Sequence, residues 1–286
     1  MYNSGVIFVF AHRVVNKIIC SDASSTGAGV IICNEVHTAH KLWTNTESVQ
    51  SSTWRELEAI RFALLSFLPS IHASKLKLLT DSQCAAKIIE SGSMKPNLNN
   101  LVVDIFNICL NNSIRIDVEW IPRAKNDQAD FVSRILDTDD WSLSEKFFSL
   151  INARWGPFTI DCFAISYNAK LPRFYSRFWN LGSSGVDAFA QNWHGENALL
   201  VPPVAVVAST LKHMHLCKCK GVIIFPWWPS QPFWPLLWSQ YRTWVKDLIT
   251  EVGYLALKHG RNHNSLLGSN DFKGCVAAAY LDFVQI

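Results

Sequence analysis

The chain has 286 residues, of which 49% are hydrophobic and 17% charged, a composition typical of globular domains and not of disordered ones. The formal net charge is only +3 and is shared nearly evenly between the two halves. Bulk charge therefore does not indicate nucleic-acid binding, and any such function must come from a site. The eight cysteines mostly stand singly in apolar stretches, no secretory signal is recognised, and no apolar run reaches the roughly 18 residues of a membrane span. These features predict an intracellular protein, cytoplasmic or nuclear, with free thiols.

Strands and amphipathic helices alternate over the first half of the chain. The predicted strands lie at 17–24, 28–33, 39–44, 76–80 and 114–120. The predicted helices lie at 51–69, 84–90, 98–110 and 126–136. Apolar residues recur at helical spacing in the helices, and tight turns join the first three strands. The order βββαβααβα predicts an α/β fold with a mixed sheet.

A change of composition follows residues 137–140, because nine of the twelve tryptophans lie beyond them. We place a linker at 137–145, between a first domain at 15–136 and a second at 146–286. Strands at 159–163, 198–201, 221–225 and 254–257 are predicted to alternate with helices at 204–215 and 235–250. This alternation indicates a second α/β sheet.

Four acidic residues stand at positions where a charge needs compensation. Asp22 ends a buried strand, and Asp81 follows the strand at 76–80, at the edge where ligands collect in open α/β sheets. Glu56 shares a helix face with core residues, and Asp130 lies on the last helix of this half. Converging carboxylates repel one another, and Mg²⁺ or Mn²⁺ relieves that repulsion with hard oxygen ligands.

Each acid also has a purely structural explanation as a cap, turn or solvated residue, and only their joint occurrence in this order favours a metal site. Glu58 is the alternative to Glu56, but it is predicted to point to solvent on the helix face of Arg61. The run from His213 to Cys219 contains two His and two Cys, but their spacing does not fit a closed zinc site.

Four motifs carry a family resemblance. They are Ser21-Asp22-Ala23-Ser24 with Gly27-Ala28-Gly29, then Trp54-Arg55-Glu56-Leu57-Glu58-Ala59, Thr80-Asp81-Ser82, and W-I-P-x-x-x-N-x-x-A-D-x-x-S-R at 120–134. Over residues 15–136 the chain resembles the ribonuclease H domain of retroelement polymerases. The resemblance implies a ribonuclease H-like mixed five-stranded sheet with flanking helices. It also implies endonucleolytic cleavage of the RNA strand of RNA–DNA hybrids by a two-metal-ion mechanism.

By motif position, the resemblance assigns Asp22, Glu56, Asp81 and Asp130 as catalytic metal ligands. Their motif neighbours Ser24, Ser82 and Asn126 are predicted to bind substrate. The expected partners are an RNA–DNA hybrid and a reverse transcriptase domain upstream in a parent polyprotein, with no membrane. Many family members carry a His before the last helix, and residues 121–125 contain none, so a differently assisted product step is expected.

The second half resembles the segment that follows ribonuclease H in DIRS-type retroelements, which is similar to phage adenine-N6 DNA methyltransferases. Asp161, Pro202 and Pro203 fall in the corresponding motifs. A polar residue and an aromatic should flank the two prolines to hold a flipped adenine, but Val201 and Val204 stand there instead. The second domain is therefore predicted to be an inactive methyltransferase-like domain, with S-adenosylmethionine an improbable cofactor.

Three functions remain open from the sequence. The first is metal-dependent ribonuclease H activity as part of retroelement reverse transcription. The second is a catalytically inactive, nucleic-acid-binding remnant, and the third is adenine-N6 methylation by the second domain.

Overall fold

The computed structural model describes residues 15–33, 35, 37–136, 141–238, 244–260 and 265–284. The chain divides into two compact units, one of residues up to 38 with Val49–Ser133 and one of Ala39–Ser48 with 134 onward. Among the described residues, no helix combines the length and the apolar character needed to cross a bilayer.

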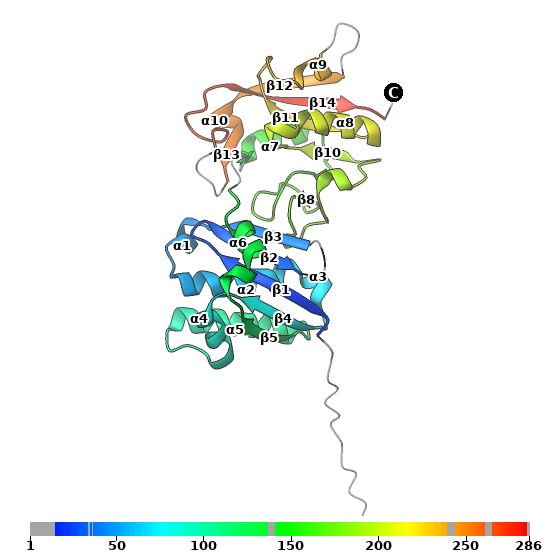
Figure 1. Cartoon of the computed structure of the whole chain (residues 1–286). Coiled ribbons are helices and arrows are strands. Elements are labelled where there is room, and N and C mark those ends of the chain that lie inside the picture. Colours follow the sequence, from blue (N-terminus) through cyan, green and yellow to red (C-terminus); the bar gives the residue numbers. More distant parts are fainter. Residues whose placement is uncertain are drawn as a thin grey trace, which may run out of the picture. The chain divides into compact units, whose positions relative to one another are not determined.

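A mixed five-stranded sheet has the strand order β3-β2-β1-β4-β5 (Figure 1). All of it belongs to the first unit except the part of β3 from Ala39 onward. β1 is antiparallel to β2 and parallel to β4, which is parallel to β5. The strands are β1 Lys17–Ala23, β2 Gly27–Ile32, β3 His37–Leu42, β4 Lys75–Thr80 and β5 Arg115–Trp120. The predicted α/β fold with a mixed sheet is confirmed.

The four predicted helices occur in the predicted order, and three short elements, α1, α3 and η1, are additional. Together they are α1 Asn45–Ser48, α2 Ser52–Ser66, α3 Leu68–Ile71, α4 Gln83–Ser91, α5 Pro96–Asn111, the 3-10 turn η1 Arg123–Lys125 and α6 Asp127–Ser133. Ser51 caps α2 by accepting a hydrogen bond from the Trp54 amide. Leu57, Ile60 and Leu64 recur at helical spacing on α2 and are fully buried.

One glycine lets the last helix lie directly on the sheet. A Cβ on Gly29 of β2 would come within 2.3 Å of the Ser133 amide nitrogen and 2.5 Å of the Ala129 carbonyl oxygen. Only glycine therefore permits this approach of α6. Asn126 fixes the start of the same helix, because its side-chain amide donates to the Ser21 carbonyl at 3.0 Å.

The second unit contains another five-stranded sheet, in the order β12-β14-β11-β10-β7. β7, β10 and β11 are parallel, whereas β14 runs antiparallel to both β11 and β12. These strands are β7 Ile160–Asp161, β10 Asn197–Leu200, β11 Lys220–Pro226, β12 Val245–Val252 and β14 Cys275–Asp282. Two small sheets pair β6 Trp141–Leu143 with β13 Leu257–His259, and β8 Tyr175–Ser176 with β9 Gly185–Val186.

The helical elements of the second unit are α7 Glu145–Trp155, η2 Ala188–Ala190, η3 Val204–Val206, α8 Val207–Cys217, α9 Trp234–Leu237 and α10 Gly253–Ala256. The secondary structure of this unit differs from the prediction in two places. The helix predicted at 235–250 is wrong, since α9 is one turn and the β-branched segment Val245–Val252 pairs as β12 with β14. The strand predicted at 254–257 is also wrong, because most of it is α10. Part of the linker predicted at 137–145 lies outside the described residues, and its described part contains β6.

Candidate metal centre

Asp22 brings a buried carboxylate to the centre of the first sheet. Its side chain is 4% exposed, and the Ser133 hydroxyl of α6 donates to its Oδ2 at 2.6 Å. Burial raises the pKa of Asp22, the Ser133 hydrogen bond lowers it, and the charges of Asp81 and Asp130 raise it further. The fold therefore holds this carboxylate in place while leaving its negative charge poorly compensated.

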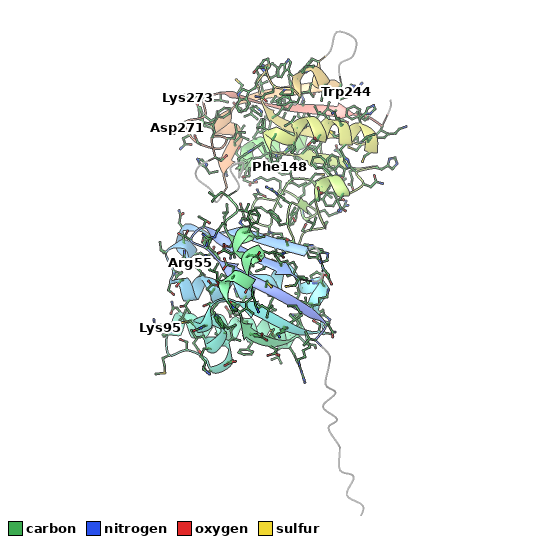
Figure 2. The ribbon with its side chains drawn as sticks, in the orientation of Figure 1. Arg55, Lys95, Phe148, Trp244, Asp271 and Lys273 are labelled. Carbon is green, nitrogen blue, oxygen red and sulfur yellow. The ribbon has the colours of Figure 1, made fainter. Side chains whose placement is uncertain are left out.

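Glu56 supplies the second carboxylate from the second turn of α2. Its Oε2 is buried and has no hydrogen-bond partner. Burial, and next the charges of Asp22 and Asp81, raise the pKa of Glu56 to about 9, although Arg55 opposes the shift. Arg55 itself lies on α2 (Figure 2). It donates to the Ser25 carbonyl at 3.3 Å. A buried acceptor without a donor is costly in a folded protein, and it indicates a missing cationic or donor ligand.

Asp81 completes the cluster from the carboxyl end of β4. The indole nitrogen of Trp120, at the end of the neighbouring strand β5, donates to the Asp81 carbonyl oxygen at 3.0 Å. Ser82, the next residue, caps α4 by accepting from the Ala85 amide at 3.2 Å. The backbone of Asp81 is therefore held on both sides.

One carboxylate oxygen from each of Asp22, Glu56 and Asp81 lies within 4.8 Å of the other two. Within the part of the chain that the structure describes, no other group of three or more His, Cys, Asp or Glu meets this condition, and His213, His215, Cys217 and Cys219 do not. Three carboxylates at this separation repel strongly in a partly buried site. Their donor set of hard oxygens fits Mg²⁺ or Mn²⁺.

Asp130 lies beside the cluster and outside the group of three. The Arg123 guanidinium donates to its Oδ1 at 2.6 Å. Its charge still raises the pKa of Asp22, so the two carboxylates interact electrostatically. Of the four acids predicted from the sequence, the structure brings three together and pairs the fourth with an arginine.

The three residues predicted to bind substrate all have partners within the protein. The Ser24 hydroxyl donates to the Ser133 carbonyl at 2.6 Å, and Ser82 is the α4 cap. Asn126 is almost fully buried and bonds to Ser21. These contacts hold β1, α4 and α6 around the acids, and substrate contact by the three residues stays a prediction.

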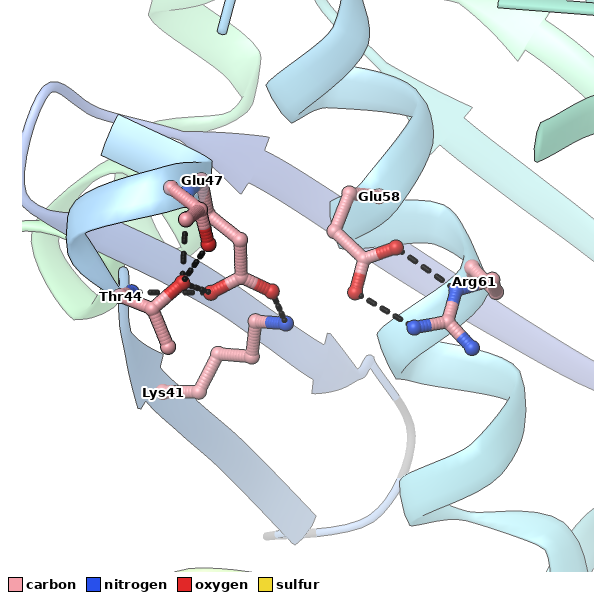
Figure 3. Close-up of polar contacts among 6 residues, drawn as sticks. Lys41, Thr44, Glu47, Glu58 and Arg61 are labelled. Carbon is pink, nitrogen blue, oxygen red and sulfur yellow. Dashed lines mark hydrogen bonds and ion pairs between the residues drawn. The ribbon is translucent and has the colours of Figure 1, made fainter. Parts of the chain in front are cut away.

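Glu58 differs from its prediction. The residue is 1% exposed, and Arg61 donates to both of its carboxylate oxygens, at 2.7 and 2.9 Å (Figure 3). The expectation that Glu58 points to solvent is wrong, because a forked arginine one turn later compensates its charge inside the fold. In the same figure Glu47, in the first turn of α1, accepts from the Thr44 amide and hydroxyl and from Lys41.

Sequence reasoning assigned no role to Ser133 or Trp120, although both stand in the motif at 120–134. Ser133 orients Asp22, and Trp120 holds the backbone of Asp81. The signal that could have found Ser133 is its spacing. It lies three residues after Asp130 on one helix, which places both on the same face of α6.

In the second unit, Asp161 ends β7 and is 2% exposed. Its Oδ2 accepts from the Lys170 amide at 3.1 Å, and its Oδ1 has no partner. Burial raises the pKa of Asp161 to about 6. Asp161, Trp141 and Asn168 line a cavity of about 10 Å³, which has room for about one water molecule.

The two prolines predicted for the methyltransferase-like motif follow β10. Pro202 is buried, and Pro203 precedes η3. Their neighbours Val201 and Val204 pack against the hydrophobic core of the unit. The apolar side chains of Val201 and Val204 thus stand where a base-binding motif needs a polar hydrogen-bond acceptor and an aromatic ring.

Comparisons with known proteins bear on the first unit. Residues 18–135 match the model of a protein family described as reverse transcriptase-like. The match and the mixed five-stranded sheet support a ribonuclease H-like domain in this part of the chain. No curated protein matches the chain.

Several solved structures are similar to part of the chain. LC11-RNase H1, in complex with an RNA/DNA hybrid, is 21% identical with a TM-score of 0.36, and the alignment covers 41% of this chain and 92% of that one. The N-terminal RNase H domain of a Mycobacterium tuberculosis protein is 17% identical, with a TM-score of 0.35 and coverages of 42% and 91%. RNase H1 from the halophilic archaeon Halobacterium salinarum is 16% identical, with a TM-score of 0.34 and coverages of 41% and 91%.

Proposed function

We propose that the first unit hydrolyses the RNA strand of RNA–DNA hybrids in a reaction that depends on divalent metal ions. The observation that carries the proposal is the cluster of Asp22, Glu56 and Asp81, with carboxylate oxygens within 4.8 Å of one another. The buried Glu56 Oε2 without a partner fits a cation better than it fits a purely structural role.

The residues present fit Mg²⁺ or Mn²⁺. Asp22, Glu56 and Asp81 would hold the ions, and Asp130 would join them by leaving Arg123. When bound, two divalent ions about 4 Å apart lower the pKa of a water nucleophile and stabilise both the attacking and the leaving oxygen of a phosphodiester. Ser133 keeps Asp22 oriented, and Trp120 keeps the Asp81 backbone in place.

The choice of substrate rests on two further arguments. The motifs at 21–29, 54–59, 80–82 and 120–134 resemble those of retroelement ribonuclease H domains, and residues 18–135 match a reverse transcriptase-like family. A fold of this kind reads the backbone shape and 2′-hydroxyls of a hybrid rather than its bases. We therefore place the activity within retroelement reverse transcription, next to a polymerase domain.

The test is cleavage of a hybrid labelled on its RNA strand, with Mg²⁺ or Mn²⁺ and with EDTA. Wild type should cleave only with metal, and Asp22→Asn and Glu56→Gln should each lose at least ~100-fold in rate, as expected when one key electrostatic group is removed. Asp104→Asn is the matched control, because Asp104 is an exposed carboxylate on α5. It should cleave like wild type.

Three outcomes would count against the proposal. Equal cleavage by wild type, Asp22→Asn and Glu56→Gln would remove these acids from the site. Cleavage of an all-RNA or all-DNA duplex at the rate of the hybrid would remove the substrate assignment. Hybrid binding without metal-dependent cleavage would favour the inactive remnant.

For the second unit we propose a structural or nucleic-acid-docking role in place of methyl transfer. The apolar Val201 and Val204 support this role, because their side chains pack into the core beside Pro202 and Pro203. Calorimetric titration of the full chain with S-adenosylmethionine should give no binding heat, and saturable binding would restore the methyltransferase function.

A further inference from the structure

Two cysteines meet across neighbouring strands of the first sheet. Cys20 lies on β1, and Cys33 directly follows β2. The antiparallel register places Cys20 opposite Ile31, and the Cys33 amide donates to the Ile18 carbonyl at 2.9 Å. The two residues are therefore diagonal neighbours on one face of the hairpin.

The sulfur atoms of the two cysteines lie close to each other, although both thiols are free. The Cys20 Sγ and Cys33 Sγ are 2.8 Å apart. A disulfide bond is about 2.04 Å long, so the two sulfur atoms would have to move together by only ~0.8 Å. The side chains of both residues already reach across the diagonal, and the hairpin holds them there.

The pair is also accessible to a reagent. Cys33 is exposed, and Cys20 is partly exposed. The adjacent Cys20 lowers the pKa of the Cys33 thiol to about 7, which increases the thiolate fraction that reacts in disulfide exchange. By contrast, Cys109, Cys162 and Cys219 are buried.

We propose that Cys20 and Cys33 form a redox-modification site, which low-molecular-weight disulfides of the glutathione type convert into an intramolecular disulfide. The Cys33 thiolate attacks one sulfur of the external disulfide, forming a mixed disulfide and releasing one thiol. The Cys20 sulfur then displaces the second thiol from Cys33. Two protein thiols are oxidised, one external disulfide is reduced to two thiols, and the two protein protons end on those thiols.

The location gives the bond a structural consequence. Cys20 and Asp22 are alternate residues of β1 and so lie on the same face of the sheet. A Cys20–Cys33 bond would close the β1–β2 hairpin on that face and restrict the unfolded chain, which stabilises the first unit. The inference does not rest on the proposed nuclease function.

The test uses the full chain, incubated with reduced or with oxidised glutathione and then alkylated after unfolding. Reduced protein should alkylate at all eight cysteines. Oxidised protein should alkylate at two fewer, and its digest should contain a linked pair of peptides carrying Cys20 and Cys33. Oxidation should also raise the melting temperature of the first unit by several degrees, and dithiothreitol should reverse both effects.

Single serine variants complete the design. Cys20→Ser and Cys33→Ser should each abolish the linked peptide and the thermal shift. Cys84→Ser removes an exposed cysteine from α4 and should change neither. The proposal is overturned if the oxidised wild type keeps eight reactive thiols, if it links through other cysteines or between chains, or if only stable mixed disulfides form.

Discussion

At the scale of single residues, the carboxylates of Asp22, Glu56 and Asp81 repel one another, and a bound cation would relieve this repulsion. Glu56 contributes most clearly, since burial and the neighbouring Asp22 and Asp81 raise its pKa to about 9 from an ordinary 4.5. The fold therefore favours the protonated form of Glu56. Without metal, ionisation of this group works against folding.

The first prediction concerns Glu56→Gln in the absence of metal. Because the folded pKa is raised, the contribution of Glu56 to the stability of wild type should be fully present below pH 4.5 and should be lost as pH rises toward about 9. The glutamine variant lacks this ionisation, so its melting temperature should exceed that of wild type at pH 8 in EDTA. The measurement is a series of melting curves between pH 5 and 9, with Asp104→Asn as the control. Parallel pH profiles for wild type and Glu56→Gln would contradict the prediction.

The second prediction concerns Ser133, whose hydroxyl orients Asp22 at 2.6 Å. Ser133→Ala removes the donor but leaves all four acids in the chain. Loss of such a supporting contact usually weakens metal affinity by ~10–100-fold. We expect the variant to need that much more Mn²⁺ for half-maximal cleavage, with a matching change in calorimetric affinity. Unchanged metal affinity would show that Asp22 does not depend on Ser133.

At the scale of elements, the first unit could be predicted from sequence because local signals agree there with tertiary packing. Ser51 and Gly92 mark helix ends, and strand-length apolar runs end at Asp22 and Asp81. Pro69 does not end α2, which stops at Ser66, and instead stands in the first turn of α3. Where local sequence signals and tertiary packing favour the same structure, the secondary structure can be predicted from the sequence. The pairing of Asp130 with Arg123 could not be predicted, since it depends on how η1 and α6 fold back.

The second unit shows where local signals fail. β14 contains Ala277, Ala278 and Ala279, which favour a helix by propensity, yet the strand lies between β11 and β12 with these residues fully buried. Small side chains suit a strand buried on both faces, and packing overrides propensity. In the segment 245–252 the β-branched residues favour a strand, and β14 provides the strand with which it pairs.

The third prediction concerns the seat of α6 on β2. Gly29→Ala would place a methyl group 2.3–2.7 Å from backbone atoms of Ala129, Val132 and Ser133. Backbone atoms of α6 can move away only if the whole helix shifts, so we expect the free energy of unfolding to fall by ~1–3 kcal/mol. Metal binding should also weaken, because Ser133 would move with α6. Urea unfolding and metal titration measure the two effects.

Gly195→Ala is the contrasting variant for this experiment. Its Cβ would meet nothing within 4 Å, and only its φ of 78° is unfavourable. It should cost no more than ~1–2 kcal/mol and leave metal binding unchanged. A Gly29→Ala protein with wild-type stability and affinity would show that α6 does not need this close approach.

At the scale of the whole molecule, the chain divides into two compact units, and its two five-stranded sheets share no strand. The acidic cluster belongs entirely to the first unit. A ligand that binds only the native form of one unit raises the melting temperature of that unit. Metal should therefore act on one part of the unfolding profile.

The fourth prediction is that calorimetry of the full chain resolves two transitions, and that Mg²⁺ or Mn²⁺ shifts only one. At a metal concentration of 100 times the dissociation constant, the shifted transition should gain about 2.7 kcal/mol. Glu56→Gln should abolish this shift while leaving both transitions present, which assigns the metal-sensitive one to the first unit. A single transition that metal shifts as a whole would mean that the two units unfold together, and a shift retained by Glu56→Gln would mean that the ions bind elsewhere.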